Sequence, residues 1–214
     1  MDGATPEENS TGRASGAIPE EGSTGHAWGV GHVVAGVVIG TVASVVAAGI
    51  IFTAGGYEEA DVLPLSMVAV MQAALWIGLL GVPLWLVAAR GVRWADLGWG
   101  ATASDAWQGL GIGVVTQVAV VPAIYVPILL LTDDLDVSGP ARELVDKATG
   151  SGILLLVLSV VVGAPIVEEL FFRGLTLRAL EARMRPRVAL VVSALVFGAV
   201  HLQVLQFPAL VAIG

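Results

Sequence analysis

The chain has 214 residues, of which 56% are hydrophobic and 13% are charged, and its formal net charge is −8. Soluble domains carry about 25% charged residues, so this composition and its long apolar runs predict a polytopic membrane protein. The lack of cysteine excludes disulfides, thiolate nucleophiles and cysteine-based zinc sites. No basic patch is interleaved with aromatic residues, so no nucleic-acid partner is expected.

The N-terminal part of the chain divides into a polar tail and three apolar spans. Residues 1–27 are rich in Gly, Ser, Thr, Pro and Glu and are expected to form a disordered, acidic, cytoplasmic tail. An N-terminal transmembrane region over residues 28–150 then contains three predicted spans, at about 28–54, 63–89 and 106–131. Pro122 and Pro127 lie inside the third span and are expected to kink it.

Two local features accompany these spans. In the polar loop after the third span, residues 140–147 are expected to form a short surface helix. Trp28, Trp94 and Trp99 lie near span ends, where tryptophan commonly anchors a helix at the membrane interface. We therefore expect these three indoles to face lipid headgroups.

The C-terminal part begins with a fourth span near residue 151, which is expected to continue as a helix to about 184. A fifth span is predicted at 188–204, and residues 207–214 look like the start of a sixth, with Pro208 in its first turn. The expected fold is all-α, a polytopic transmembrane helix bundle with about five full spans plus the start of a sixth. Because the last apolar run reaches Gly214 without a polar end, we expect the chain to be C-terminally incomplete.

The basic residues predict the orientation in the membrane, since cytoplasmic loops are enriched in Lys and Arg. A cytoplasmic N-terminus leaves only Arg142 and Lys147 of the 10 basic residues outside. The other basic residues are then cytoplasmic: Arg13, Arg90, Arg93, Arg173, Arg178, Arg183, Arg185 and Arg187. The protein is therefore expected to be a multi-pass plasma-membrane protein in contact with lipid.

An acidic pair ends the longest uncharged stretch of the fourth span. Glu168 and Glu169 follow an apolar run from Ile153 to Val167, and a carboxylate at membrane depth costs at least about 2.5–3.5 kcal/mol, so the pair indicates a function. Glu169 and Arg173 are four residues apart and can pair on one helix face. Glu168 points about 100° away from Glu169, so it is the freer carboxylate, able to face a cavity and bind water as a general base.

The second polar feature is His201, in the fifth predicted span, with Phe197 one turn before it on the same helix face. An antiparallel helix pair joined near Pro186 puts His201 and Glu168 at similar depth, since each lies about 15–18 residues from that turn. We therefore expect the two side chains to be close. Phe171 and Phe172 are expected to form apolar walls beside the acids.

Simpler interpretations stay open for these residues. Adjacent glutamates near a membrane interface can be solvated, and a lone histidine on an apolar helix is often a hydrogen-bonded packing residue. Other chemistries lack their motifs: the chain has no HExxH zinc motif, no Gly-x-Gly-Asp of aspartyl proteases, no P-loop and no dinucleotide fingerprint.

The pattern Glu168-Glu169-x-x-x-Arg173, followed 24 residues later by Phe197-x-x-x-His201, resembles the CPBP family of intramembrane proteases. This family includes CAAX prenyl endopeptidases of the Rce1 type and the bacterial Abi proteins. The resemblance covers residues 151–214 and implies that they are a CPBP-like protease core. It further implies an intramembrane endopeptidase that cleaves a membrane-associated protein or peptide, with water activated by Glu168 and His201 and with Glu169 and Arg173 supporting the site.

The resemblance leaves the cofactor open between a divalent metal such as zinc and no metal. Glu168 and His201 are the candidate metal ligands, but one Glu and one His are a poor zinc set beside the usual three protein ligands. The family also has an H-x-x-x-Asn or H-x-x-x-Asp motif on a later helix, which supplies an oxyanion stabiliser. Nothing after His201 matches this motif, so the chain as given is expected to have little or no activity.

Two functions outside proteolysis stay open at this point. The first is a non-catalytic membrane immunity or assembly protein that uses the same bundle. The second is a proton-coupled transporter in which the Glu168–His201 pair relays protons. Bacterial members of the family need not process prenylated CAAX proteins, so the resemblance does not identify the substrate.

Overall fold

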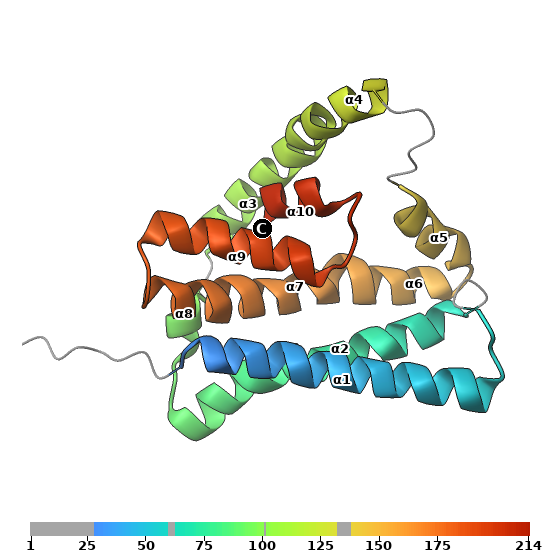
Figure 1. Ribbon diagram of the computed structural model, residues 1–214, viewed down its shortest axis with the longest axis horizontal. Helices are drawn as coiled ribbons and strands as arrows, with labels where there is room; N and C mark the ends of the chain where they lie inside the picture. The colour runs from blue at the N-terminus through green and yellow to red at the C-terminus, as the bar shows by residue number, and fades with distance from the viewer. Residues whose placement is uncertain (1–27, 60–62, 101, 132–137) are drawn as a thin grey trace, which may run out of the picture.

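The computed structural model describes residues 28–59, 63–100, 102–131 and 138–214 (Figure 1). Every regular element within these ranges is helical, which confirms the all-α class. The predicted tail, with Arg13, lies outside the described residues.

Four helices in the described part of the chain are long and apolar enough to cross a membrane: Val30–Gly55 (α1), Leu65–Arg90 (α2), Ala103–Leu131 and Gly152–Glu181. A bilayer offers no water to backbone N–H and C=O groups, so an apolar segment satisfies them internally by forming a helix. Since each residue adds 1.5 Å, the 26-residue helices α1 and α2 are about 39 Å long, more than the ~30 Å hydrocarbon core. The chain is therefore a multi-pass membrane protein.

The third of these helices, Ala103–Leu131, changes register at its middle. It consists of α3 (Ala103–Val115), a π-helical turn η2 (Thr116–Val120) and α4 (Val121–Leu131). Pro122 is the second residue of α4, and Pro127 lies further inside the same helix. The helix continues through both prolines, with a wider π-helical turn just before the first of them, and turns of this kind are a common cause of kinks.

The fourth helix, Gly152–Glu181, also alternates between α and π geometry. Its five consecutive parts are α6 (Gly152–Leu156), η3 (Val157–Gly163), α7 (Ala164–Glu168), η4 (Glu169–Leu177) and α8 (Arg178–Glu181). The boundary between α7 and η4 falls between the two adjacent glutamates. A change of helical register at this point is notable because π-helical turns are frequent at functional sites.

Where a fifth full span was expected, the structure has a shorter apolar helix. Helix α9 covers Pro186–Val200, which is 15 residues and about 22 Å, less than the ~30 Å hydrocarbon core. The helix stops because His201 caps it and Leu202 takes a left-handed φ of 55°. The apolar residues beyond, among them Val204 and Leu205, extended the prediction past this end.

The shorter helices agree with their predictions. Helix α5 (Gly139–Lys147) corresponds to the expected surface helix. Helix α10 (Phe207–Ile213) begins with Pro208 in its first turn, as expected for the start of the sixth apolar segment. A single 3₁₀ turn, η1 (Trp94–Leu97), lies between the second and third long helices.

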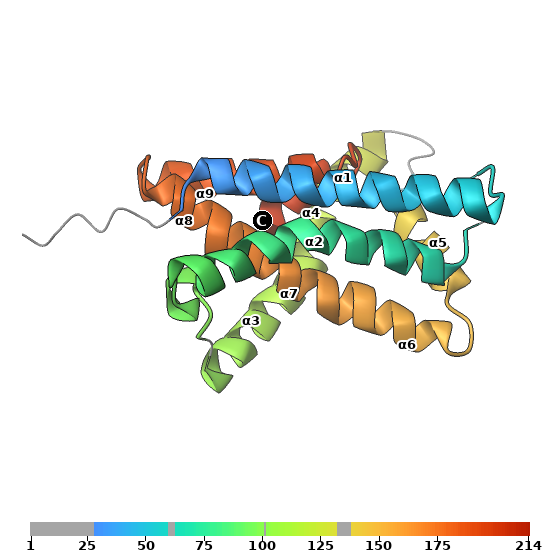
Figure 2. The same ribbon diagram turned by 90° about the horizontal axis from the view of Figure 1, so that it is seen from below.

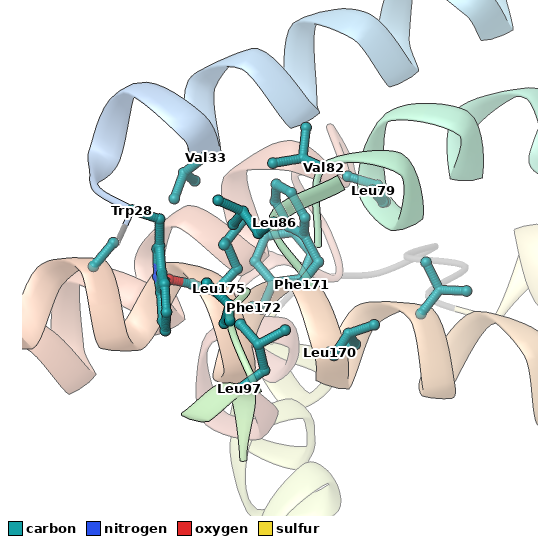
Figure 3. Packing of buried hydrophobic residues seen from close by; sticks show 13 residues of the cluster. Trp28, Val33, Leu79, Val82, Leu86, Leu97, Leu170, Phe171, Phe172 and Leu175 are labelled. Atoms are coloured by element: carbon teal, nitrogen blue, oxygen red, sulfur yellow. The ribbon is translucent and has the colours of Figure 1, made fainter. Parts of the chain in front are cut away.

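The main core joins α1, α2 and η4 (Figure 3). Phe171 and Leu175 of η4 and Leu86 of α2 are fully buried in it. Trp28, just before α1, is also buried and donates its indole N–H to the carbonyl of Leu175 at 3.1 Å. This indole therefore serves the core and not the membrane interface predicted for it.

Glycines let α1 and α2 approach closely along their length, as the two helices do in Figure 2. A Cβ built on Gly78 would lie 2.1 Å from the carbonyl oxygen of Gly36, and one on Gly40 would lie 2.4 Å from that of Leu75. Small residues at such contacts let helix backbones pack in lipid, where no hydrophobic force drives them together. The closely packed α1–α2 pair thus forms the surface against which η4 packs.

Candidate active site

The two adjacent glutamates of the fourth helix face different partners. Glu168 ends α7 with a side chain that is 27% exposed, whereas the side chain of Glu169, which begins η4, is 54% exposed. Glu168 lies next to His201, and Glu169 pairs with Arg173. This division of the acids matches the one expected from their angular separation on the helix.

The structure brings Glu168 and His201 together from separate helices. The turn between α8 and α9 reverses the chain (Figure 1), and the Oε1 of Glu168 lies 3.8 Å from the Nε2 of His201. The Nδ1 of His201 is 2.7 Å from the carbonyl oxygen of Phe197. Because a carbonyl oxygen only accepts hydrogen bonds, we assign the proton to Nδ1, and the lone pair of Nε2 then faces Glu168 in the neutral ring.

A series of aromatic contacts connects this pair to the core. The ring centroids of Phe171 and Phe172 are 5.2 Å apart, those of Phe172 and Phe197 are 5.1 Å apart, and those of Phe197 and His201 are 4.6 Å apart. Phe172 lines the pocket at Glu168, as expected. Phe171 does not, because its ring is buried against Gly36 of α1. The packed rings hold the histidine in a fixed orientation.

Arg173 links the acidic pair to the last helix. Its guanidinium bonds the carboxylate of Glu169 at 2.5 Å through Nη1 and donates from Nη2 to the carbonyl oxygen of Ile213 at 2.8 Å. Both charged side chains are about half exposed, so the ion pair itself contributes only about 0.2–1 kcal/mol. Its main effect is positional, because it ties η4 to the end of α10.

A pocket of about 230 Å³ contains Glu168 and His201 and is closed on another side by α1 and α2. Two polar residues of that side, Thr41 and Gln72, were not predicted as site residues. A signal for Gln72 exists in the sequence, since it is the sole side-chain amide within the predicted span 63–89. Thr41 gives no such signal, because threonine is common in membrane helices.

The side chains at this pocket do not fit a zinc site. Among the described residues, no group of three or more His, Cys, Asp or Glu side chains lies close enough together to hold a metal ion. Glu168 and His201 supply two ligands, whereas catalytic zinc is usually held by three protein ligands. Description of the protein as a metalloprotease therefore has no support from the residues present.

Comparison with known families identifies the segment that carries these residues. Residues 150–214 match the family model described as type II CAAX prenyl endopeptidase Rce1-like. Neither a comparison with curated proteins nor one with solved structures found a match. The matched segment contains Glu168, Glu169, Arg173 and His201, and its family suggests a membrane protease that acts on a protein substrate. Residues 150–214 are thus an Rce1-like CAAX prenyl endopeptidase domain, as the motifs predicted.

Proposed function

We propose that the protein is an intramembrane endopeptidase in which Glu168 and His201 activate a water molecule that attacks a peptide bond. One observation carries this proposal: the two side chains, from different helices, lie 3.8 Å apart in a pocket within the Rce1-like segment. By its family, the substrate is a membrane-associated protein or peptide.

The geometry of the pair suits a shared water. With the proton of His201 on Nδ1, the Nε2 lone pair and the Glu168 carboxylate are two acceptors that face each other across 3.8 Å. Two acceptors gain nothing from direct contact, but one water can donate a hydrogen bond to each of them. That water is held beside a base and is partly shielded from lipid by Phe172.

The reaction then follows general acid–base chemistry. Glu168 accepts a proton from the water, and the water oxygen forms a bond to the carbonyl carbon of the substrate. The electron pair of the C=O double bond moves to its oxygen, and it returns when the C–N bond breaks. The leaving nitrogen takes the proton from Glu168, which restores the carboxylate. No step in this sequence requires a metal ion.

Glu169 and Arg173 have a supporting role in this proposal. Their ion pair keeps a second carboxylate from competing for the water, and the Arg173 bond to Ile213 fixes the position of η4 relative to α10. We further propose that the N-terminus faces the cytoplasm and that the protein lies in the plasma membrane. The proposed domain division places the catalytic segment at 151–214, after an N-terminal transmembrane region of residues 28–150.

The test is Glu168→Gln in the protein expressed from its complete reading frame and reconstituted in liposomes. The probes are a farnesylated peptide that ends in Cys-aliphatic-aliphatic-X and the same peptide without the lipid. The substitution keeps the shape of the side chain but removes the base, so cleavage should fall at least about 10²–10⁴-fold. Glu143→Gln is the matched control, because this glutamate lies on α5 and pairs with Lys147 away from the pocket; it should cleave normally.

Three results would contradict the proposal. Full activity of Glu168→Gln would remove the base from the mechanism. No cleavage of any membrane peptide by the unsubstituted protein would favour a non-catalytic immunity or assembly protein. Loss of pH-coupled uptake on Glu168→Gln substitution, in a protein that does not cleave, would indicate a proton-coupled transporter.

A further inference from the structure

Gln72 is a polar side chain of the pocket for which the proposed mechanism has no role. It lies on α2, which between Leu65 and Ala89 has no charged residue. Its side chain lines the same pocket as Glu168, in α7, and His201, which caps the C-terminus of α9. The pocket therefore places an amide on the α2 side and the proposed water-activating pair on the side formed by the C-terminal segment.

The close contact of α1 and α2 fixes the position of Gln72. The Oγ of Ser44 on α1 donates to the carbonyl oxygen of Met71, the residue before Gln72, at 3.1 Å. One turn further, the backbone of Gly40 packs against Leu75 so closely that a Cβ would clash at 2.4 Å. The turn of α2 that carries the amide is therefore held rigidly, as a binding group requires.

The amide of Gln72 makes no hydrogen bond to another residue within the described ranges. Its neighbours along the same side of the pocket, Leu75 and Leu79, are apolar. A polar group next to apolar side chains is costly unless it has a partner. The protein thus carries a polar group that is placed to pair with something that enters the pocket.

We propose that the side-chain amide of Gln72 binds the peptide group of the substrate. In this arrangement Nε2–H donates a hydrogen bond to the carbonyl oxygen of the scissile peptide bond. This inference rests on the proposed endopeptidase function. It goes further by assigning a substrate-binding residue on α2, outside the segment 150–214 that matches the family.

The chemistry of the substrate explains the choice of an amide. A peptide bond that moves from water into an apolar pocket brings one donor and one acceptor, and both need partners. In a trans peptide group the C=O and N–H point to opposite sides, and an N–H donor of the carboxamide side chain can satisfy the carbonyl oxygen. When water attacks, the carbonyl oxygen gains negative charge, and the Nε2–H donor then becomes a stronger partner.

The experiment compares Gln72→Met with Gln117→Met in the reconstituted protein, with the farnesylated peptide as probe. Methionine keeps the length of the side chain but cannot form the hydrogen bonds. Gln72→Met should lower kcat/KM about 10- to 100-fold. Its thermal midpoint should be unchanged or higher, because the amide has no partner to lose in the free protein. Gln117 lies on η2 and lines a different pocket, so Gln117→Met should keep the original kcat/KM.

A binding measurement gives a second readout that does not depend on turnover. In the Glu168→Gln background, the Kd of the intact peptide is compared with that of an analogue whose scissile C=O is reduced to CH₂. Adding Gln72→Met should weaken binding of the intact peptide about 5- to 10-fold and leave binding of the reduced analogue unchanged. Equal weakening of both peptides would overturn the assignment.

The outcomes separate this inference from the function on which it rests. If Glu168→Gln abolishes cleavage while Gln72→Met keeps kcat/KM within about twofold of the unsubstituted protein, the endopeptidase stands and the role of Gln72 is wrong. If Gln72→Met lowers both activity and the thermal midpoint, Gln72 is a packing residue and the assignment is also wrong. If Glu168→Gln remains active, both proposals fail.

Discussion

The third and fourth long helices look alike in sequence but occupy very different environments. Their lengths are 29 and 30 residues, and an 18-residue apolar window in each has a mean hydropathy of 2.2 and 2.3, respectively. Among the described side chains of the third helix, Tyr125 is the sole buried hydrophobic one. The fourth helix buries a full set of hydrophobic side chains: Val167, Leu170, Phe171, Phe172, Leu175, Ala179 and Leu180. Hydropathy therefore identifies a membrane-spanning helix, but it does not predict how much of that helix is buried against the others.

The two helices also differ in what they do for the pocket. In Figure 1 the α3–α4 helix crosses the rest of the bundle obliquely, whereas α7 and η4 run alongside α9. The α3–α4 helix contributes no residue to the pocket at Glu168. A hydrogen bond from the Tyr125 hydroxyl to the carbonyl oxygen of Leu205 at 2.8 Å anchors this helix to the C-terminal part. Four substitutions test whether the more buried helix also contributes more to the stability of the protein.

The largest effect is expected for Phe171→Ala on η4. The ring is fully buried between α1 and α2, so its removal leaves a cavity in the main core. Such a change should lower the free energy of unfolding by about 3–5 kcal/mol. Unfolding in detergent, followed by circular dichroism over a denaturant series, measures this loss. A loss below ~1 kcal/mol would mean that the core at η4 packs no better than the third helix.

The next largest effect is expected for Gly78→Ala on α2. The added methyl group would meet the backbone of α1, with Gly36 O at 2.1 Å and Gly40 N at 2.2 Å, and backbone moves less easily than a side chain. Overpacking of this kind should destabilise the protein by about 1–3 kcal/mol. Gly81→Ala is the matched control on the same helix, because nothing lies within 4 Å of the position that its added methyl group would take. Equal denaturation midpoints for the two variants would rule out a tight α1–α2 contact.

A smaller effect is expected for Tyr125→Phe on α4. The change deletes the hydroxyl that bonds Leu205 and keeps the ring, so the loss should be about 0.5–1.5 kcal/mol. Hydrogen exchange should then rise in α4 more than in η4. Uniform exchange across both helices would indicate that the third helix is held by more than this anchor.

The smallest effect is expected for Leu130→Ala, also on α4. This side chain is 80% exposed, so its truncation removes little buried surface. The unfolding free energy should stay within about 0.5 kcal/mol of the original value. A loss as large as that for Phe171→Ala would show that a partner covers this face of the third helix. The third and fourth helices would then not differ in how tightly they are packed.

Much of the architecture was predictable because it depends on local rules. Long uncharged runs predicted the four long helices, and the spacing of Glu169 and Arg173 predicted their ion pair. The proximity of Glu168 and His201 followed from counting residues back to the turn at Pro186. Each of these predictions uses sequence distance alone, which an antiparallel helix pair preserves in space.

The remaining features depend on contacts between segments far apart in the chain. Trp28 is buried because the carbonyl of Leu175 is there to accept its N–H, and Phe171 leaves the pocket because Gly36 makes room for its ring. The end of α9 was misplaced because apolar residues continue past Val200, while a left-handed Leu202 stops the helix. The place of Gln72 in the pocket depends on the packing of α2 against α7.

The early end of α9 has a consequence for how water reaches the interior. A helix of 15 residues, about 22 Å long, is shorter than the hydrocarbon layer, and irregular backbone follows it at His201. Non-helical backbone at membrane depth is tolerated only where protein covers it or where it lines an aqueous cavity. At membrane depth, the backbone after Val200 therefore requires protein cover or contact with water, and this irregular segment begins at the histidine that faces Glu168. The proposed peptide hydrolysis consumes water, so contact of this segment with water would supply its second reactant beside His201.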